Sequence, residues 1–93
     1  MKISGRQVTA ARNLLGITQV ELAEAANVAE STVMRFEAGQ AEPQRASLEK
    51  IVTELTRRGI EFINGVGPGV RLNLEKAAEY ARMNTSAGRG ADR

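Results

Sequence analysis

The sequence predicts a small, mainly helical protein with four short helices, a β-hairpin and a possible short fifth helix. Two capping-box patterns and apolar residues at helical spacing fall within the first 59 residues, where they indicate successive helices. Short β-rich runs with Asn-Gly and Pro-Gly turn signals follow them. A chain of 93 residues has room for one core, so we expect a helical domain over residues 1–59 with smaller elements attached.

The first helix is predicted to begin after Ser4, which forms a capping box with Gln7 three positions later. Apolar residues follow at i, i+3, i+6 and i+7, namely Val8, Ala11, Leu14 and Leu15. Gly16 can end the helix because glycine readily takes the positive φ of a helix terminus.

Residues 18–39 are predicted to form two short helices joined by a tight turn. Thr18 and Glu21 make a second capping box, so a helix should begin near Gln19. It should end at Asn27, because asparagine tolerates the left-handed conformation. The apolar residues of the next helix leave a polar outward face that consists of Glu30, Ser31, Thr32 and Arg35.

A loop from Gly39 to Pro43 precedes the fourth helix, which we expect over residues 45–58. Its apolar residues recur at i, i+3, i+4 and i+7, namely Leu48, Ile51, Val52 and Leu55. Arg57 and Arg58 suit its C-terminus, where positive charge interacts favourably with the helix dipole.

The glycine-rich segment 64–69 joins two β-rich runs, and we interpret the whole as a β-hairpin over residues 60–72. A phosphate-binding loop is the alternative, but no lysine, serine or threonine ends the glycine run and no helix opens from it. A two-stranded hairpin is marginal alone and exposes its edges. It must fold back on the fourth helix or pair with a second chain, and we expect a dimer interface made of Ile60, Phe62, Ile63, Val70 and Leu72.

Residues 73–83 are weakly helical, with Leu74, Ala77, Ala78 and Ala81 predicted on one face. Residues 84–93 contain nothing to bury and are expected to form a flexible tail.

Composition excludes several classes of function. The chain has no cysteine and no histidine, which removes disulfides, thiol nucleophiles, the usual zinc sites and histidine acid–base catalysis. Since it also lacks a nucleophile–base pair and a cofactor motif, we expect no catalytic residue, no cofactor and no metal, and hence no enzyme. No apolar run is long enough for a signal peptide or a membrane helix, so we expect a cytoplasmic protein without membrane contact.

The stretch 18–39 resembles the helix-turn-helix of the lambda-repressor/Cro-like (Xre-type) DNA-binding domains. The matching residues are Gln19, Ala23, Asn27, Val28 and Val33, followed by Phe36, Glu37, Ala38 and Gly39. A helical hairpin of an ordinary bundle would need the apolar residues but not Gln19 or the Phe-Glu-x-Gly ending. With the flanking helices and a similar hairpin in a subset of Xre-like proteins, the resemblance covers residues 4–72.

The resemblance also implies a structural ion pair. Arg12 lies among the core-facing positions of the first helix, and a buried arginine requires a charged or hydrogen-bonding partner. In the family, an arginine of the first helix pairs with the glutamate after the aromatic residue of the third helix, and Glu37 stands at that spacing. The alternative is two solvated side chains.

The function implied is sequence-specific binding of double-stranded DNA by a transcriptional regulator, with a recognition helix over about residues 30–38 in the major groove. Glu30, Ser31, Thr32 and Arg35 are the expected base contacts, and Gln19 and Arg45 the expected phosphate contacts. A homodimer on a palindromic operator would raise the affinity.

Three features oppose tight DNA binding by one subunit. Residues 1–58 contain eight basic residues against seven glutamates, and Ala29 stands where the family often has a capping serine or threonine. Glu30 also puts a negative charge where the duplex comes close. A second hypothesis is therefore a protein-binding helix-turn-helix module, an antiactivator or antitoxin-like partner of another regulator. It shares every core residue with the first hypothesis.

Overall fold

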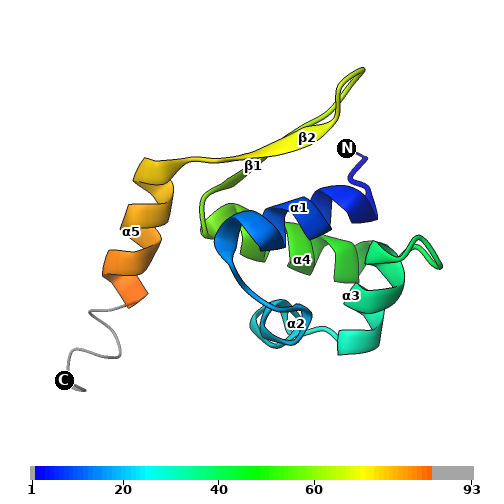
Figure 1. Ribbon diagram of the computed structural model, residues 1–93. Helices are drawn as coiled ribbons and strands as arrows, with labels where there is room; N and C mark the ends of the chain where they lie inside the picture. The colour runs from blue at the N-terminus through cyan, green and yellow to red at the C-terminus, as the bar shows by residue number, and fades with distance from the viewer. Residues whose placement is uncertain (1, 85–93) are drawn as a thin grey trace.

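The computed structural model describes residues 2–84, and these residues form the predicted succession of helices followed by a hairpin (Figure 1). The elements are α1 (Gly5–Leu15), α2 (Gln19–Ala26), α3 (Glu30–Glu37), α4 (Arg45–Arg57), β1 (Ile60–Ile63), β2 (Gly69–Leu72) and α5 (Leu74–Asn84). The predicted fold class, four helices with a C-terminal hairpin and a short fifth helix, is confirmed.

Local capping sets the boundaries of the first helices. The Ser4 side chain accepts a hydrogen bond from the backbone N–H of Gln7, and the Gln7 side chain accepts one from the backbone N–H of Ser4. Thr18 and Glu21 form the same reciprocal pair at the start of α2. Gly16 and Asn27 end α1 and α2 in the left-handed conformation, at φ of 71° and 61°. At the start of α3, Ala29 provides no side-chain cap.

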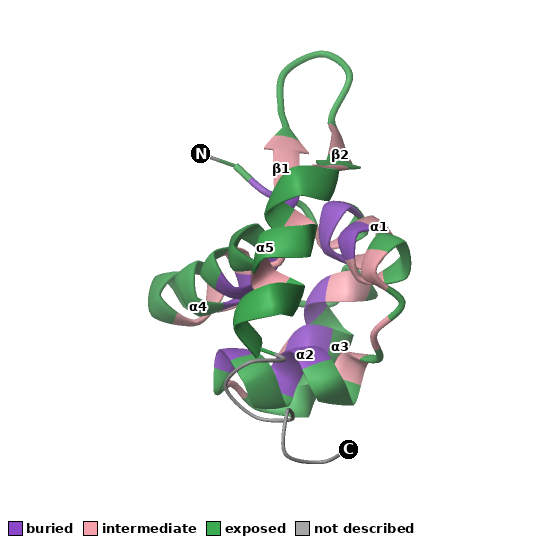
Figure 2. Cartoon of the chain, turned by 90° about the vertical axis from the view of Figure 1, so that its left-hand side faces the viewer, coloured by how far each residue is buried: buried purple, intermediate pink, exposed green. Residues whose placement is uncertain are grey.

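The core lies where the four helices meet, and Figure 2 shows the buried residues on their facing sides. Helix α2 packs against both α3 and α4, while α1 packs against α3. The largest side chains that are fully buried come from every one of these helices and from the first strand, namely Val8, Leu22, Val33, Ile51, Leu55 and Ile60.

The hairpin packs on the helices of its own chain. Its antiparallel register runs from Ile60 opposite Leu72 to Ile63 opposite Gly69, with β2 against α1 and β1 against α4. The side-chain amide nitrogen of Gln7 donates hydrogen bonds to the carbonyl oxygens of Ile63 and of Gly69, each at 3.0 Å. Gln7 therefore links α1 to both strands where the connecting turn begins and ends. Ile60 is only 1% exposed within the chain, so its side chain packs in the core of its own subunit.

Helix α5 turns a different face to the protein than the sequence predicted. Leu74 is 74% exposed, and Ala78 and Ala81 are also exposed, while Ala77 and Tyr80 lie toward the end of α4. The cause is a close backbone approach at Gly59, where an added Cβ would lie 3.0 Å from the Ala77 nitrogen. In Figure 1, α5 stands apart from the other helices.

Within residues 2–84 no helix is long and apolar enough to cross a membrane. Of the predicted tail, Asn84 ends α5, and residues 85–93 lie outside the described part of the chain.

Candidate nucleic-acid interface

The outward side of α3 is polar. Val33 and Phe36 are buried in the core, while Thr32 and Glu37 are half-buried at its margins. Three of the four predicted base contacts, Glu30, Ser31 and Arg35, are exposed, and Thr32 is partly covered. The exposed side of α3 therefore carries Glu30, Ser31 and Arg35 together with Met34, while Thr32 lies at its margin.

A loop residue that the sequence analysis did not single out lies beside the predicted base contacts. Ser31, Thr32 and Arg35 line one pocket together with Ala41, Glu42 and Pro43 from the loop after α3. Glu42 thus adds a negative charge to the pocket that Arg35 lines. No local sequence signal places this loop against α3, because its path depends on how α4 packs.

The Arg12–Glu37 pair is present and bidentate. Arg12 donates from Nε and Nη2 to the two carboxylate oxygens of Glu37, each at 2.8 Å, and from Nη1 to the Ile17 carbonyl at 3.1 Å. Its side chain is 15% exposed and that of Glu37 is 6% exposed, so solvent screens the pair only weakly. It ties α1 to the end of α3 and thereby fixes the angle at which α3 leaves the core.

Hydrogen bonding determines the charge state of the pair. Burial alone would raise the pKa of Glu37, but hydrogen bonds from Arg12, Gln19 and Thr9, together with the charge of Arg12, hold this pKa below its usual value. The hydrogen bond to Glu37 raises the pKa of Arg12 above its ordinary value. Both residues therefore remain charged near neutral pH.

The predicted phosphate contact Gln19 is half-buried, and its amide nitrogen donates to Glu37 at 3.0 Å. An amide nitrogen carries a second hydrogen, which is free to meet an anion at the start of α2. Gln19 therefore links the start of α2 to the Arg12–Glu37 pair.

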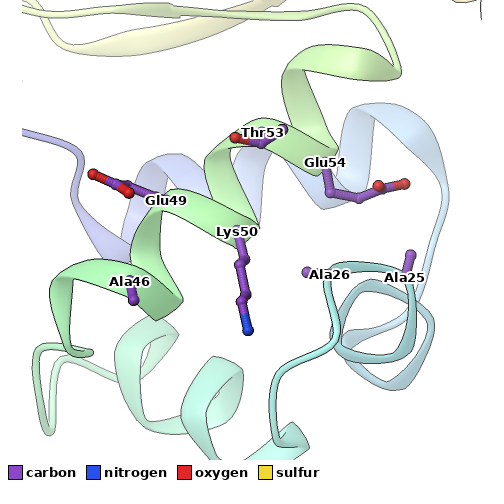
Figure 3. A pocket seen from close by; sticks show the side chains of 7 residues that line it. All are labelled: Ala25, Ala26, Ala46, Glu49, Lys50, Thr53 and Glu54. Carbon is purple, nitrogen blue, oxygen red and sulfur yellow. The ribbon is translucent and has the colours of Figure 1, made fainter.

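Two cations of α4 have no ion-pair partner among the described residues. Arg45, the second predicted phosphate contact, is exposed at the first position of the helix. Lys50, which the sequence analysis did not assign, extends from α4 into a pocket that it shares with Ala25, Ala26 and Ala46 (Figure 3). Residues 2–84 contain no cluster of acidic residues suited to a metal ion.

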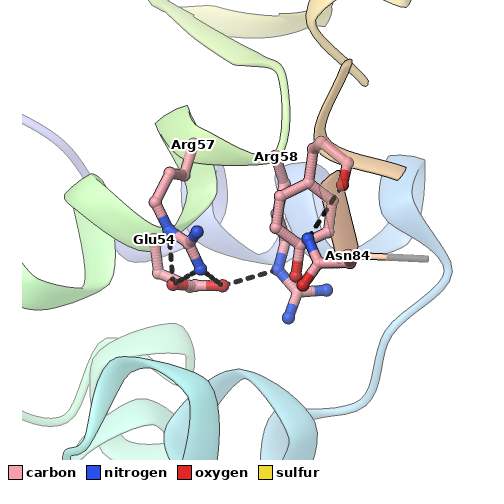
Figure 4. A network of polar contacts seen from close by, with 5 residues as sticks. Glu54, Arg57, Arg58 and Asn84 are labelled. Carbon is pink, nitrogen blue, oxygen red and sulfur yellow. Dashed lines mark hydrogen bonds and ion pairs between the residues drawn. The ribbon is translucent and has the colours of Figure 1, made fainter. Parts of the chain in front are cut away.

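Glu54 on α4 is a buried acid that the sequence analysis did not identify. Glu54 is 5% exposed and accepts hydrogen bonds from Arg57, at 3.1 Å, and from Arg58, at 2.7 Å (Figure 4). The i, i+3 and i, i+4 spacing was a usable signal for these pairs. Besides their favourable interaction with the helix dipole, the two arginines neutralise Glu54 and stack on Tyr80.

Comparison with known families identifies the domain. A sequence model of a family described as helix-turn-helix matches residues 8–58, more than half of the chain and nearly all of α1 to α4. No curated protein matches the chain. Together with the exposed polar side of α3, the match shows that the chain belongs to the Xre/lambda-repressor-like helix-turn-helix family, whose general function is DNA binding in transcription regulation.

Proposed function

We propose that the protein is a sequence-specific transcriptional regulator that inserts α3 into the major groove of double-stranded DNA. The observation that carries the proposal is the exposed side of α3, where Arg35 makes no ion pair with any described residue. Its guanidinium is free to donate two hydrogen bonds to a guanine. Ser31 and Thr32 suit base edges or a thymine methyl group, and Glu30 suits the amino group of cytosine.

Gln19 and Arg45 are proposed to contact phosphates. Each begins a helix, where unpaired backbone N–H groups and the helix dipole favour an anion. Phosphate contacts set the register of the protein on the duplex without reading sequence. This assignment predicts that replacing either residue weakens binding to all DNA sequences by a similar factor.

Dimerisation through the hairpin is also proposed, on a smaller surface than the sequence indicated. Ile63 is 40% exposed, and Phe62, Val70 and Leu72 are only half-buried against the helices. The two-stranded sheet leaves unpaired backbone groups at its edges, which a second copy can cover. A dimer would hold two recognition helices about 34 Å apart, as a palindromic operator with half-sites one helical turn apart requires.

Selection of bound duplexes from a random pool tests the DNA-binding proposal. We expect an enriched palindrome, and we expect Arg35→Ala to cost about 1–3 kcal/mol and relax preference at one base position. Lys76→Ala is the control, since Lys76 is an exposed cation on α5, outside both the helix-turn-helix and the hairpin. If the pool yields no enriched duplex and the protein shows no salt-dependent binding to a DNA fragment, the protein-binding alternative replaces this proposal.

Sedimentation equilibrium tests the dimer. Ile63→Asp should shift the protein from dimer to monomer while its helical circular dichroism persists, because the side chain contributes little to the core. Val66→Asp is the control, since Val66 is fully exposed at the hairpin tip, and it should leave the dimer intact. An intact chain that is monomeric at tens of micromolar would remove the hairpin interface from the proposal.

A further inference from the structure

The burial pattern of α3 brings one apolar side chain onto its DNA-facing side. An α-helix turns about 100° per residue, so the side opposite the buried Val33 and Phe36 is centred on Ser31 and Ala38. Met34 and Arg35 flank that centre. Ser31 and Ala38 are short, which leaves Met34 and Arg35 as the two long side chains that reach farthest outward.

Met34 is 46% exposed and is the large apolar residue of α3 that the core does not cover. The edges of the base pairs in the major groove carry mostly hydrogen-bonding groups, and the apolar exception is the C5-methyl group of thymine. Methionine is suited to this contact, because its side chain is flexible and its sulfur is polarizable. A polar groove would leave Met34 without a favourable partner unless a thymine stood opposite it.

We propose that Met34 reads a thymine by packing against its methyl group, within about two base pairs of the guanine that Arg35 contacts. This inference rests on the proposed function. Adjacent residues of a helix rise only about 1.5 Å along its axis, whereas stacked bases on one strand are about 3.4 Å apart. The small rise keeps Met34 and Arg35 within about two base pairs of each other, although their side chains leave the helix about 100° apart. The methionine adds an apolar contact beside the hydrogen bonds of Arg35.

A methyl-deletion cycle tests the contact on the duplex that the protein itself enriches from the random pool. Each thymine is replaced in turn by deoxyuridine, which removes the methyl group and keeps every hydrogen-bonding group. At one position in each half-site we expect the intact protein to lose about fourfold in affinity, the value of one buried methyl group. Met34→Ala should bind the thymine duplex more weakly and should not distinguish it from the deoxyuridine duplex.

Two variants control for indirect effects. Leu14→Ala removes a residue of α1 that is similarly exposed, at 48%, and should keep the full deoxyuridine penalty. Met34→Leu keeps an apolar side chain and should keep most of the penalty. The contrary result is that Met34→Ala binds its duplex specifically and still loses affinity wherever the intact protein does when deoxyuridine replaces thymine. That result would reject the proposed methyl contact and leave the DNA-binding proposal standing. If no duplex is enriched, both are wrong.

Discussion

The four-helix body, which consists of α1 to α4, is stabilised by different interactions from those that attach helix α5 to it. The body buries apolar side chains from each of its helices and closes around the Arg12–Glu37 pair. Helix α5 buries no residue. It is fixed at its start by Asn73, which caps the helix and donates its backbone N–H to the Gly59 carbonyl at 2.8 Å, and farther along by Tyr80 beneath the guanidinium groups of Arg57 and Arg58.

Most of the stability of the protein therefore comes from the four-helix body. Local opening costs little where few apolar contacts are lost, so α5 should separate from the body far more often than the body unfolds. The proposed recognition helix α3 belongs to the stable part. Changes in the body should therefore alter both folding and DNA binding, and changes at α5 should alter neither by much.

The largest effect is expected at Arg12 and Glu37. Arg12→Ala leaves the Glu37 carboxylate buried without its cation, and Glu37→Ala does the reverse, so each should lower the free energy of unfolding by about 3–5 kcal/mol. Urea denaturation of the two single variants and the double variant measures their coupling. Strict additivity would show that the two charges contribute independently.

Gly5→Ala should come next, because α1 begins against the backbone of α3. A Cβ at Gly5 would overlap the carbonyl oxygen of Phe36, so α1 must shift, at a cost of about 1–3 kcal/mol. Gly67→Ala in the hairpin turn is the matched control, since a Cβ there meets no atom within 4 Å. Thermal unfolding distinguishes the two, and equal melting temperatures would contradict the close approach of α1 to α3.

Acid should weaken the body through Glu37. Its pKa is lowered in the folded state, so its contribution to stability is complete above its unfolded pKa of about 4.3 and is lost as the pH falls through the folded value. We expect the effect to be smaller than that of Glu37→Ala, because a protonated carboxyl still accepts hydrogen bonds. The stability of Glu37→Gln, measured from pH 7 to pH 3, should fall less steeply than that of the unchanged protein.

The smallest effect is expected at Tyr80. Tyr80→Ala removes the stack with Arg57 and Arg58, which is worth about 0.5–1 kcal/mol at an exposed site. The stability of the body should stay nearly constant, while the amides of α5 exchange with solvent faster. Unchanged exchange in α5 would mean that Asn73 and Gly59 alone hold the helix.

The sequence predicted the helix boundaries well because the groups that set them are close along the chain. Ser4 and Gln7, or Thr18 and Glu21, satisfy each other's backbone donors within a single turn. It did not predict the orientation of α5, because the close approach of Ala77 to Gly59 turns the helix and leaves Leu74 exposed. Glu42 was missed for a similar reason, because the loop after α3 has no periodic pattern.

Short-range sequence patterns predicted the order and ends of the helices, the apolar faces of α1 to α4 and the polar outward residues of α3. Tertiary packing buries Ile60 within its own chain, and it places Glu42 in the pocket that Arg35 lines. Capping and helical periodicity depend on residues a few positions apart, whereas these placements depend on how segments distant in the chain pack around one core.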